Sequence, residues 1–319
     1  MLDPGSLYTL NPDIVDGGPA QDHRLDRPVL VQALGGFVDA GGAVRLAREH
    51  LLDTLESEVV ATFDVDQLLD YRARRPVMLF VEDHWESYEE PRLELRAVRD
   101  GAGTSFLLLT GPEPDVQWER FVAAVAQLVE RFDVRLSVGL NAIPMAVPHT
   151  RPAGLTAHAS RKDLVADYEP WVASVQVPAS AGHLLEFRLG RAGRDAMGFA
   201  VHVPHYVAQA DYPAASVALL DAVARATGLV LPTGALEQAA GSTRAAIDEQ
   251  VRQSEEVSSV VHALEGQYDS FVGGRARSLL ADSPAELPTA DELADELERF
   301  LAEQSGPSGQ SGGEGSTEA

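Results

Sequence analysis

Residues 29–42, VLVQALGGFVDAGG, decide the fold class of this chain. The apolar run from Val29 to Ala33 has the length of a strand buried on both faces, and a glycine-rich turn follows it before a predicted helix. Similar short runs recur at residues 59–63, 77–81, 106–109 and 134–138. Buried strands that alternate with helices predict an α/β protein built around a mostly parallel sheet.

Two amphipathic helices are expected among these strands. Residues 116–132 place apolar side chains at helical spacing, with Asp115 as the expected N-cap. Residues 214–227 follow Pro213 and stop at Gly228, which are residues typical of a helix start and a helix stop. These helices are expected to cover the sheet.

The predicted strands also include a hairpin and a further strand pair. Residues 93–97 and 105–110 predict a hairpin that turns at Asp100-Gly101. Residues 184–189 and 199–203 predict a further strand pair across a loop that contains two glycines.

After residue 232 the pattern changes to helices alone. One long helix is expected from a cap at Ser242 or Thr243 to Gly273-Gly274, and a last helix from the capping box that begins at Thr289. The last residues are rich in Gly and Ser and predict disorder. We therefore expect an α/β domain at 1–231, a helical C-terminal subdomain at 232–304 and a disordered acidic Gly/Ser tail at 305–319.

The composition excludes several classes of protein. The chain of 319 residues has 49 acidic against 25 basic side chains, a net charge of -24. That balance argues against nucleic acid or an anionic membrane surface as a partner. The absence of cysteine excludes disulfides, a thiol nucleophile and thiolate metal sites. With no secretory signal and no apolar run long enough to span a membrane, a cytoplasmic location is expected.

The glycine-rich turn is the first candidate ligand site, with Gly35, Gly36, Asp39, Gly41 and Gly42 as its residues. Free N–H groups at the start of a helix can bind an anion. The spacing fits neither the dinucleotide fingerprint nor the phosphate-binding P-loop. Asp39 also stands where an N-cap would be and would compete with a phosphate. A structural turn with a capped helix and a ligand loop both remain open.

A second candidate lies in residues 141–152, NAIPMAVPHTRP. Open α/β sheets place ligands at the carboxyl ends of their strands, and Asn141, His149 and Arg151 follow such a strand. Three prolines stiffen the segment, which would equally suit a buried loop or a subunit contact.

No metal site or cofactor is predicted. Residues 82–86, EDHWE, combine carboxylates with a histidine, but no second segment that would complete a metal site can be identified. His202 and His205 would point to opposite faces of a strand. The motif GxSxG occurs at 309–313, in the predicted tail, where the strand-turn-helix that it needs is absent. Catalytic residues are therefore not assigned.

Three ordered segments carry a family resemblance. GGFVDAGG at 35–42, NAIPMAVPHTRPAGLTAHAS at 141–160 and PHYVAQADYPAASVALLDAV at 204–223 together resemble the proteasome assembly chaperone family, second chaperone type, in its actinobacterial form. The likeness covers roughly residues 25 to 300.

The resemblance implies a three-layer α/β/α sandwich of the purine nucleoside phosphorylase and hydrolase type. It also implies a homo-oligomer, with a trimer expected, and proteasome subunits as candidate partners. It supplies no catalytic residues. Two functions stay open: a non-enzymatic, chaperone-like protein that acts through protein-protein interaction, and a phosphorylase- or hydrolase-like enzyme acting on a nucleoside or related small molecule. The first is preferred.

Overall fold

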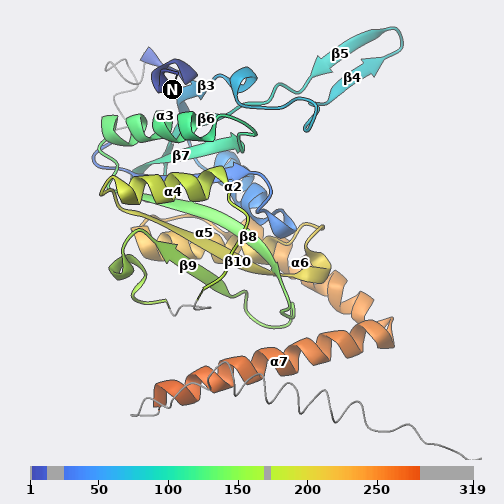
Figure 1. Ribbon diagram of the computed structural model, residues 1–319. Helices are drawn as coiled ribbons and strands as arrows, with labels where there is room; N and C mark the ends of the chain where they lie inside the picture. The colour runs from blue at the N-terminus through green and yellow to red at the C-terminus, as the bar shows by residue number, and fades with distance from the viewer. Residues whose placement is uncertain (1, 13–24, 169–173, 281–319) are drawn as a thin grey trace, which may run out of the picture. The chain divides into compact units, whose positions relative to one another are not determined.

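The computed structural model describes residues 2–12, 25–168 and 174–280 (Figure 1). The chain divides into two compact units, Met1–Gly266 and Gln267–Ala319. The first unit contains the sheets and the sites discussed below. The predicted domain boundaries at residues 231 and 304 stay predictions.

One large mixed sheet organises the first unit. Within the described residues its strands run, in spatial order, β1 (Tyr8–Leu10), β3 (Ser57–Phe63), β6 (Glu94–Arg99), β7 (Ser105–Pro112), β2 (Val29–Gly35), β8 (Leu136–Met145), β10 (Ala196–Pro204) and β9 (Leu155–Ala159). The four central strands, β7, β2, β8 and β10, are parallel, and antiparallel strands extend the sheet on both sides. The strands predicted at 29–33, 59–63, 106–109 and 134–138 are confirmed, as is the hairpin between β6 and β7.

Helices cover both faces of this sheet (Figure 1). Leu30 in β2 packs in one apolar cluster with residues of α3 (Trp118–Arg131) and α4 (Ala181–Arg191). Its neighbours Val29 and Val31 point to the opposite cluster, with residues of α2 (Ala43–Thr54) and α5 (Pro213–Thr227). Because successive strand residues face opposite sides, a continuous apolar run serves both layers. The three-layer α/β/α sandwich is confirmed.

The helices predicted at 116–132 and 214–227 form as α3 and α5, but one predicted cap is wrong. Gly228 ends α5 in the left-handed conformation at φ 78°. Gln117, not Asp115, precedes α3 as its N-cap residue. The Asp115 carboxylate instead accepts hydrogen bonds from the Asp70 backbone N–H and the Arg74 guanidinium, so it holds a neighbouring loop.

The strand predicted at 184–189 is wrong, because this segment belongs to α4. Ala181, Leu185 and Leu189 recur every four residues and are buried against the sheet. Ser180 caps the helix, since its Oγ accepts a hydrogen bond from the His183 backbone N–H at 3.1 Å. Helical spacing and a good N-cap therefore prevail over the alternation of Leu with charged residues.

The strand predicted at 77–81 forms, but the expectation that it is buried on both faces is wrong. β4 (Met78–Val81) pairs only with β5 (His84–Tyr88), in a separate antiparallel hairpin. Its side chains are exposed. Figure 1 shows this hairpin standing away from the eight-stranded sheet.

The single long helix expected after residue 232 is two helices, α6 (Gly234–Arg252) and α7 (Glu255–Leu280). Ser254 interrupts them, and its Oγ accepts a hydrogen bond from Val257 N–H at 3.3 Å. The expected caps at Ser242 and Thr243 fall inside α6, and the expected end at Gly273-Gly274 falls inside α7. The predicted Thr289 helix and the tail lie outside the described residues.

Short 3-10 turns complete the first unit: η1 (Pro4–Leu7), η2 (Ala40–Gly42), η3 (Val65–Gln67), η4 (Lys162–Val165) and η5 (His205–Val207). No helix in the described parts of the chain is long and apolar enough to cross a membrane.

Candidate functional site

The glycine-rich turn after β2 forms a capped helix start. The two Asp39 carboxylate oxygens accept hydrogen bonds from Val44 N–H at 2.7 Å and Arg45 N–H at 3.1 Å, at the beginning of α2. Burial raises the pKa of Asp39, and these two N–H groups oppose the rise. Gly41 and Gly42 have φ 66° and 56°, which only glycine adopts at little cost. An anion at this helix start would therefore compete with a resident carboxylate.

His149, from the second candidate segment, is buried with both ring nitrogens engaged. Nδ1 lies 2.6 Å from the Tyr206 hydroxyl, and Nε2 lies 3.0 Å from Asp248 Oδ1 in α6. Burial is the main reason why the pKa of Tyr206 rises to about 12. Next to it, Thr150 Oγ1 donates to Glu265 Oε1 at 2.5 Å, and the same carboxylate pairs with Arg151 at 3.3 Å. These contacts tie the loop after β8 to the helices that follow α5.

A cleft of about 760 Å³ opens beside this loop, between it and the helices α5 and α6. Its lining includes His149 and Arg151 together with Arg225 and Arg244. The cleft does not include Asn141 or any residue of the glycine-rich turn.

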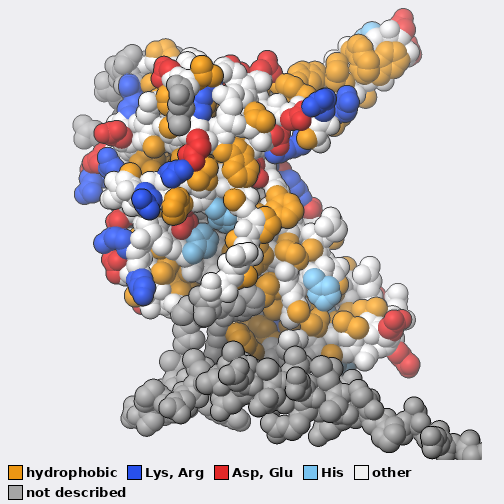
Figure 2. Space-filling model, in the orientation of Figure 1, with side chains coloured by type: hydrophobic (Ala, Val, Ile, Leu, Met, Phe, Trp, Pro, Cys, Tyr) orange, Lys and Arg blue, Asp and Glu red, His pale blue; other side chains and the backbone are white. Residues whose placement is uncertain are grey.

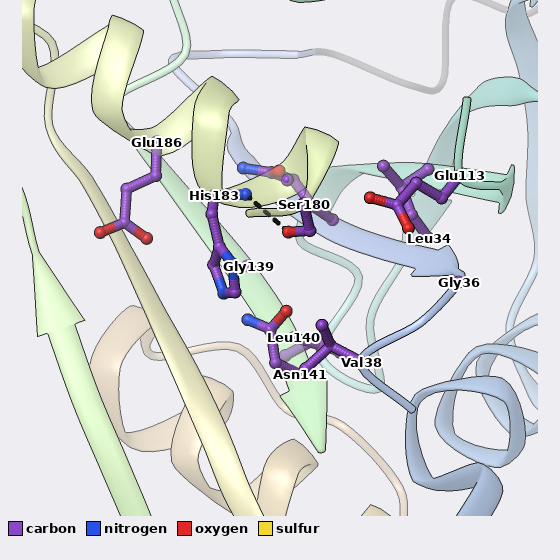
Figure 3. A pocket seen from close by; sticks show the side chains of 12 residues that line it. Leu34, Gly36, Val38, Glu113, Gly139, Leu140, Asn141, Ser180, His183 and Glu186 are labelled. Atoms are coloured by element: carbon purple, nitrogen blue, oxygen red, sulfur yellow. Dashed lines mark hydrogen bonds between the residues drawn. The ribbon is translucent and has the colours of Figure 1, made fainter. Parts of the chain in front are cut away.

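A smaller cavity lies between α4 and the strands β2 and β8, on the side of their carboxyl ends (Figure 3). It has a volume of about 30 Å³, enough for one water-sized group. β2 and β8 are neighbours in the sheet, and after them the chain continues to strands on opposite sides, to β3 after β2 and to β9 and β10 after β8. Such a switch point is where open α/β sheets bind ligands. Four polar side chains that line it are less than a tenth exposed: Gln32, Glu113, Asn141 and Ser180. We call it the inner cavity.

The polar groups of the inner cavity are only partly satisfied. Gln32 Nε2 donates to Ser137 Oγ at 2.7 Å, while Gln32 Oε1 is buried without a hydrogen-bond partner. Glu113 Oε1 accepts the Ala181 N–H at 2.6 Å, at the first residue of α4. A buried polar atom without a partner is costly, so this cavity has the features of a binding site.

His183 lines the inner cavity, and His158 lies next to it. The His158 and His183 rings lie 5.7 Å apart in an edge arrangement, and His158 Nδ1 is 2.8 Å from Glu186 Oε2. Burial, and then the neighbouring His158, lower the pKa of His183. Figure 3 shows the His183 ring pointing toward Asn141. His183 therefore favours the neutral imidazole, which can accept a proton or a hydrogen bond.

The lowered pKa of His183 predicts a loss of stability in mild acid. Below the ordinary histidine pKa of 6.5 the unfolded chain binds a proton at His183 that the folded chain resists, so the free energy of unfolding falls as the pH drops through 6.5 toward the folded pKa. Replacing His183 with Gln should remove this component. Urea titrations of both proteins between pH 5 and 7.5 measure the difference, and parallel pH profiles would contradict the prediction.

The structure separates the eight residues selected from the sequence. Gly36 and Asn141 line the inner cavity. Gly35, Gly36 and Asp39 line a wider cleft of about 720 Å³, which we call the outer cleft and which shares Gly36 and Glu113 with the inner cavity. His149 and Arg151 line the cleft beside α5 and α6, and Gly41 and Gly42 shape the turn into α2. Ligand binding at these positions stays a prediction.

The acidic segment 82–86 lies on the β4–β5 hairpin. His84 pairs there with Asp83 at 3.0 Å and Glu86 at 3.3 Å. Across the described ranges, no group of three or more His, Cys, Asp or Glu side chains is placed to hold a metal ion.

Sequence reasoning missed Gln32, Glu113 and His183. Gln32 carried a usable signal, because it is the only polar residue in the apolar run 29–33. Glu113 follows the strand predicted at 106–109 and thus its carboxyl end. His183 stands next to the segment that the sequence assigned to a strand, so the helix that presents it was not expected.

Comparison with known proteins adds a family and several solved structures. Residues 33–251 match the model of the PAC2 family. A Mycobacterium tuberculosis protein of unknown function, Rv2714, is 50% identical over 85% of this chain and 93% of its own, with a TM-score of 0.78. A Corynebacterium glutamicum protein of unknown function is 42% identical over 83% of this chain and 98% of its own, with the same TM-score of 0.78.

A third structure, the Mycobacterium tuberculosis proteasome-assembly chaperone homologue Rv2125, is 26% identical over 73% of this chain and 99% of its own, with a TM-score of 0.68. None of the curated proteins compared with the chain matches it.

Proposed function

The chain belongs to the PAC2 family, and from that premise we propose that it is a non-enzymatic, proteasome-assembly-chaperone-like protein that acts through protein-protein interaction. The likeness to a structure described as a proteasome-assembly chaperone homologue supports this function. The single observation that carries it is the exposed apolar hairpin β4–β5, a surface that suits a protein partner.

The hairpin exposes several large apolar side chains. Leu79, Phe80 and Trp85 are 51%, 53% and 62% exposed, and Phe80 contacts Trp85 with ring centroids 5.0 Å apart. Figure 2 shows apolar side chains along most of its length. A lone two-stranded hairpin is marginally stable in water, and a contiguous apolar patch marks an interaction site. We assign this surface to self-association, with a trimer as the expected form. Proteasome subunits are the candidate clients.

The candidate ligand residues fit this function better than catalysis. Asp39 is committed to the start of α2, and His149 to Tyr206 and Asp248. An enzyme would need an acid or base, an anion site and a shared water-excluding pocket. Asp39, His149 and Arg151 line two different clefts. The alternative of a phosphorylase- or hydrolase-like enzyme on a nucleoside therefore has less support.

A charge placed on the hairpin should abolish self-association. In Phe80→Asp the carboxylate would enter the apolar contact unpaired, which is strongly unfavourable. Phe187→Asp on α4 is the matched control, because Phe187 is 54% exposed and Phe80 is 53% exposed. We expect wild type and Phe187→Asp to sediment as oligomers and Phe80→Asp to sediment as a folded monomer.

The same three proteins, immobilised at moderate salt, test whether proteasome subunits bind. Wild type and Phe187→Asp should capture purified proteasome subunits from the same organism. An oligomer that survives Phe80→Asp would refute the role of the hairpin. Failure of wild type to retain any proteasome subunit would refute the proposed function, whatever its oligomeric state.

A further inference from the structure

Closely packed residues shape the inner cavity and leave a buried polar atom facing it. A Cβ atom on Gly36 would lie 2.1 Å from Glu113 Oε2. Any larger residue at position 36 would therefore displace the Glu113 carboxylate from its observed position. On the opposite side, Gln32 Oε1 lies 3.7 Å from the position that a Cβ on Gly182 would take. Gln32 is 3% exposed and this oxygen has no hydrogen-bond partner. The cavity thus presents a buried, unused acceptor.

The charged side chains that line the inner cavity itself are acidic. Glu113 and Glu186 line it, and its lining includes neither lysine nor arginine. Glu186 pairs with His158. Glu113 is 7% exposed; its carboxylate accepts the neutral Ala181 N–H, and the Arg74 guanidinium reaches its backbone carbonyl oxygen at 2.8 Å but is not paired with its carboxylate. A buried carboxylate without a cation is unfavourable, and a cationic guest would offset that cost.

We propose that the inner cavity binds the primary ammonium group of a small molecule, with Glu113 as its counter-ion and Gln32 Oε1 as an acceptor. An ammonium group has three N–H donors and no acceptor, which matches a cavity lined by the unpartnered Gln32 Oε1 and the Glu113 carboxylate. The volume of about 30 Å³ admits one such group and excludes a larger head group. The described residues lack a cluster of three metal-ligating side chains, so an amine fits better than a metal ion.

The outer cleft indicates what the rest of the ligand carries. It adjoins the inner cavity through Gly36 and Glu113, and its wall includes Arg45, Arg48 and Arg74. Arg45 pairs with Asp211 and Arg74 with Asp115. The Arg48 guanidinium lies 3.5 Å from the Glu49 carboxylate, and the Arg48 side chain is 18% exposed. A guanidinium is suited to bind a carboxylate. The ligand class is therefore an amino acid or a short peptide, held by its amine inside and its acid outside. This site does not depend on the proposed chaperone-like function.

Calorimetry and thermal unfolding of the full-length wild-type protein with glycine, diglycine and triglycine test the site. Each probe is compared with its N-acetylated form, which has no ammonium group, and with its C-terminal amide, which has no acid. We expect saturable binding and a higher unfolding temperature for at least one free peptide. N-acetylation should weaken its binding about tenfold or more, because it removes the charge-assisted hydrogen bonds. The length that binds best reports the span between the two sites.

Glu113→Gln should weaken the same probe about tenfold or more, since the amide keeps the shape of the side chain and removes its charge. Glu130→Gln, at an exposed position on α3, is the matched control and should bind as wild type does. Equal binding of free and N-acetylated peptides, full binding by Glu113→Gln, or no binding by any free amine at millimolar concentration would overturn the proposal. The N-acetyl comparison uses wild type alone and therefore holds even if a variant does not fold.

Discussion

Gly111→Ala is expected to lower the free energy of unfolding by about 3 to 5 kcal/mol, because two unfavourable effects coincide at one position. Gly111 lies in β7 at φ 135°, a conformation that L side chains rarely adopt. A Cβ atom there would lie 2.3 Å from the Arg92 carbonyl oxygen and 2.7 Å from Leu93 Cα. Both are backbone atoms, which cannot move aside by changing a rotamer. Relief would require moving the chain just before β6, the antiparallel neighbour of β7.

Gly103→Ala separates strain from collision. Gly103 also has positive φ, at 84°, but a Cβ atom there meets no heavy atom within 4 Å. Only the conformational cost remains, so a loss of about 1 kcal/mol is expected. Urea unfolding monitored by tryptophan fluorescence measures both variants against wild type. Equal losses would show that β6 and β7 yield to the added methyl group.

Much of the sheet was predictable from the sequence, because a strand buried between two helical layers must be apolar on both faces. The run 29–33 supplies both clusters at once and has no other stable environment. The run 77–81 has the same character but lies on an exposed hairpin. Apolar composition indicates that a segment is stabilised by burial. It does not indicate whether the same chain or another molecule buries the segment.

The missed helix shows a different limit. Leu185, Phe187 and Leu189 alternate with charged residues as in a half-buried strand. Ala181, Leu185 and Leu189 define the buried face of a helix. Both patterns are present in α4, and the Ser180 cap and the packing on the sheet decide between them. Propensity alone is a weak guide where tertiary contacts are strong.

The candidate site was harder to predict than the fold for a geometric reason. Gln32, Glu113 and His183 come from the middle of β2, the end of β7 and the start of α4, which are far apart in the chain. Asn141 and Gly36 were selected because they follow strands, and the structure brings these two to the same cavity. His149 and Arg151 follow β8 too, but they lie in a proline-rich loop that contacts α6 and α7 instead of the inner cavity.

Phe199→Ala is expected to cost about 3 to 5 kcal/mol of unfolding free energy, since it leaves a cavity in the core between the sheet and its helices. Phe199 is 0% exposed in β10 and packs in the cluster beneath α2 and α5, with its ring centroid 5.5 Å from that of Tyr168. β10 is hydrogen-bonded to strands on both sides, with Leu140 opposite Phe199 in β8. The backbone there cannot collapse to fill the space, so the full loss for a buried aromatic is expected.

Phe37→Ala is the matched control, because Phe37 is 79% exposed. Its unfolding free energy should stay within about 0.5 kcal/mol of wild type. Urea unfolding of both variants measures the difference, and the dependence on urea concentration should be unchanged if the same surface is exposed on unfolding. A loss below about 1.5 kcal/mol for Phe199→Ala would mean that α5 moves onto the sheet to fill the cavity. The core beside Leu140 and Asn141 would then be deformable, and so would the wall of the inner cavity that Asn141 lines.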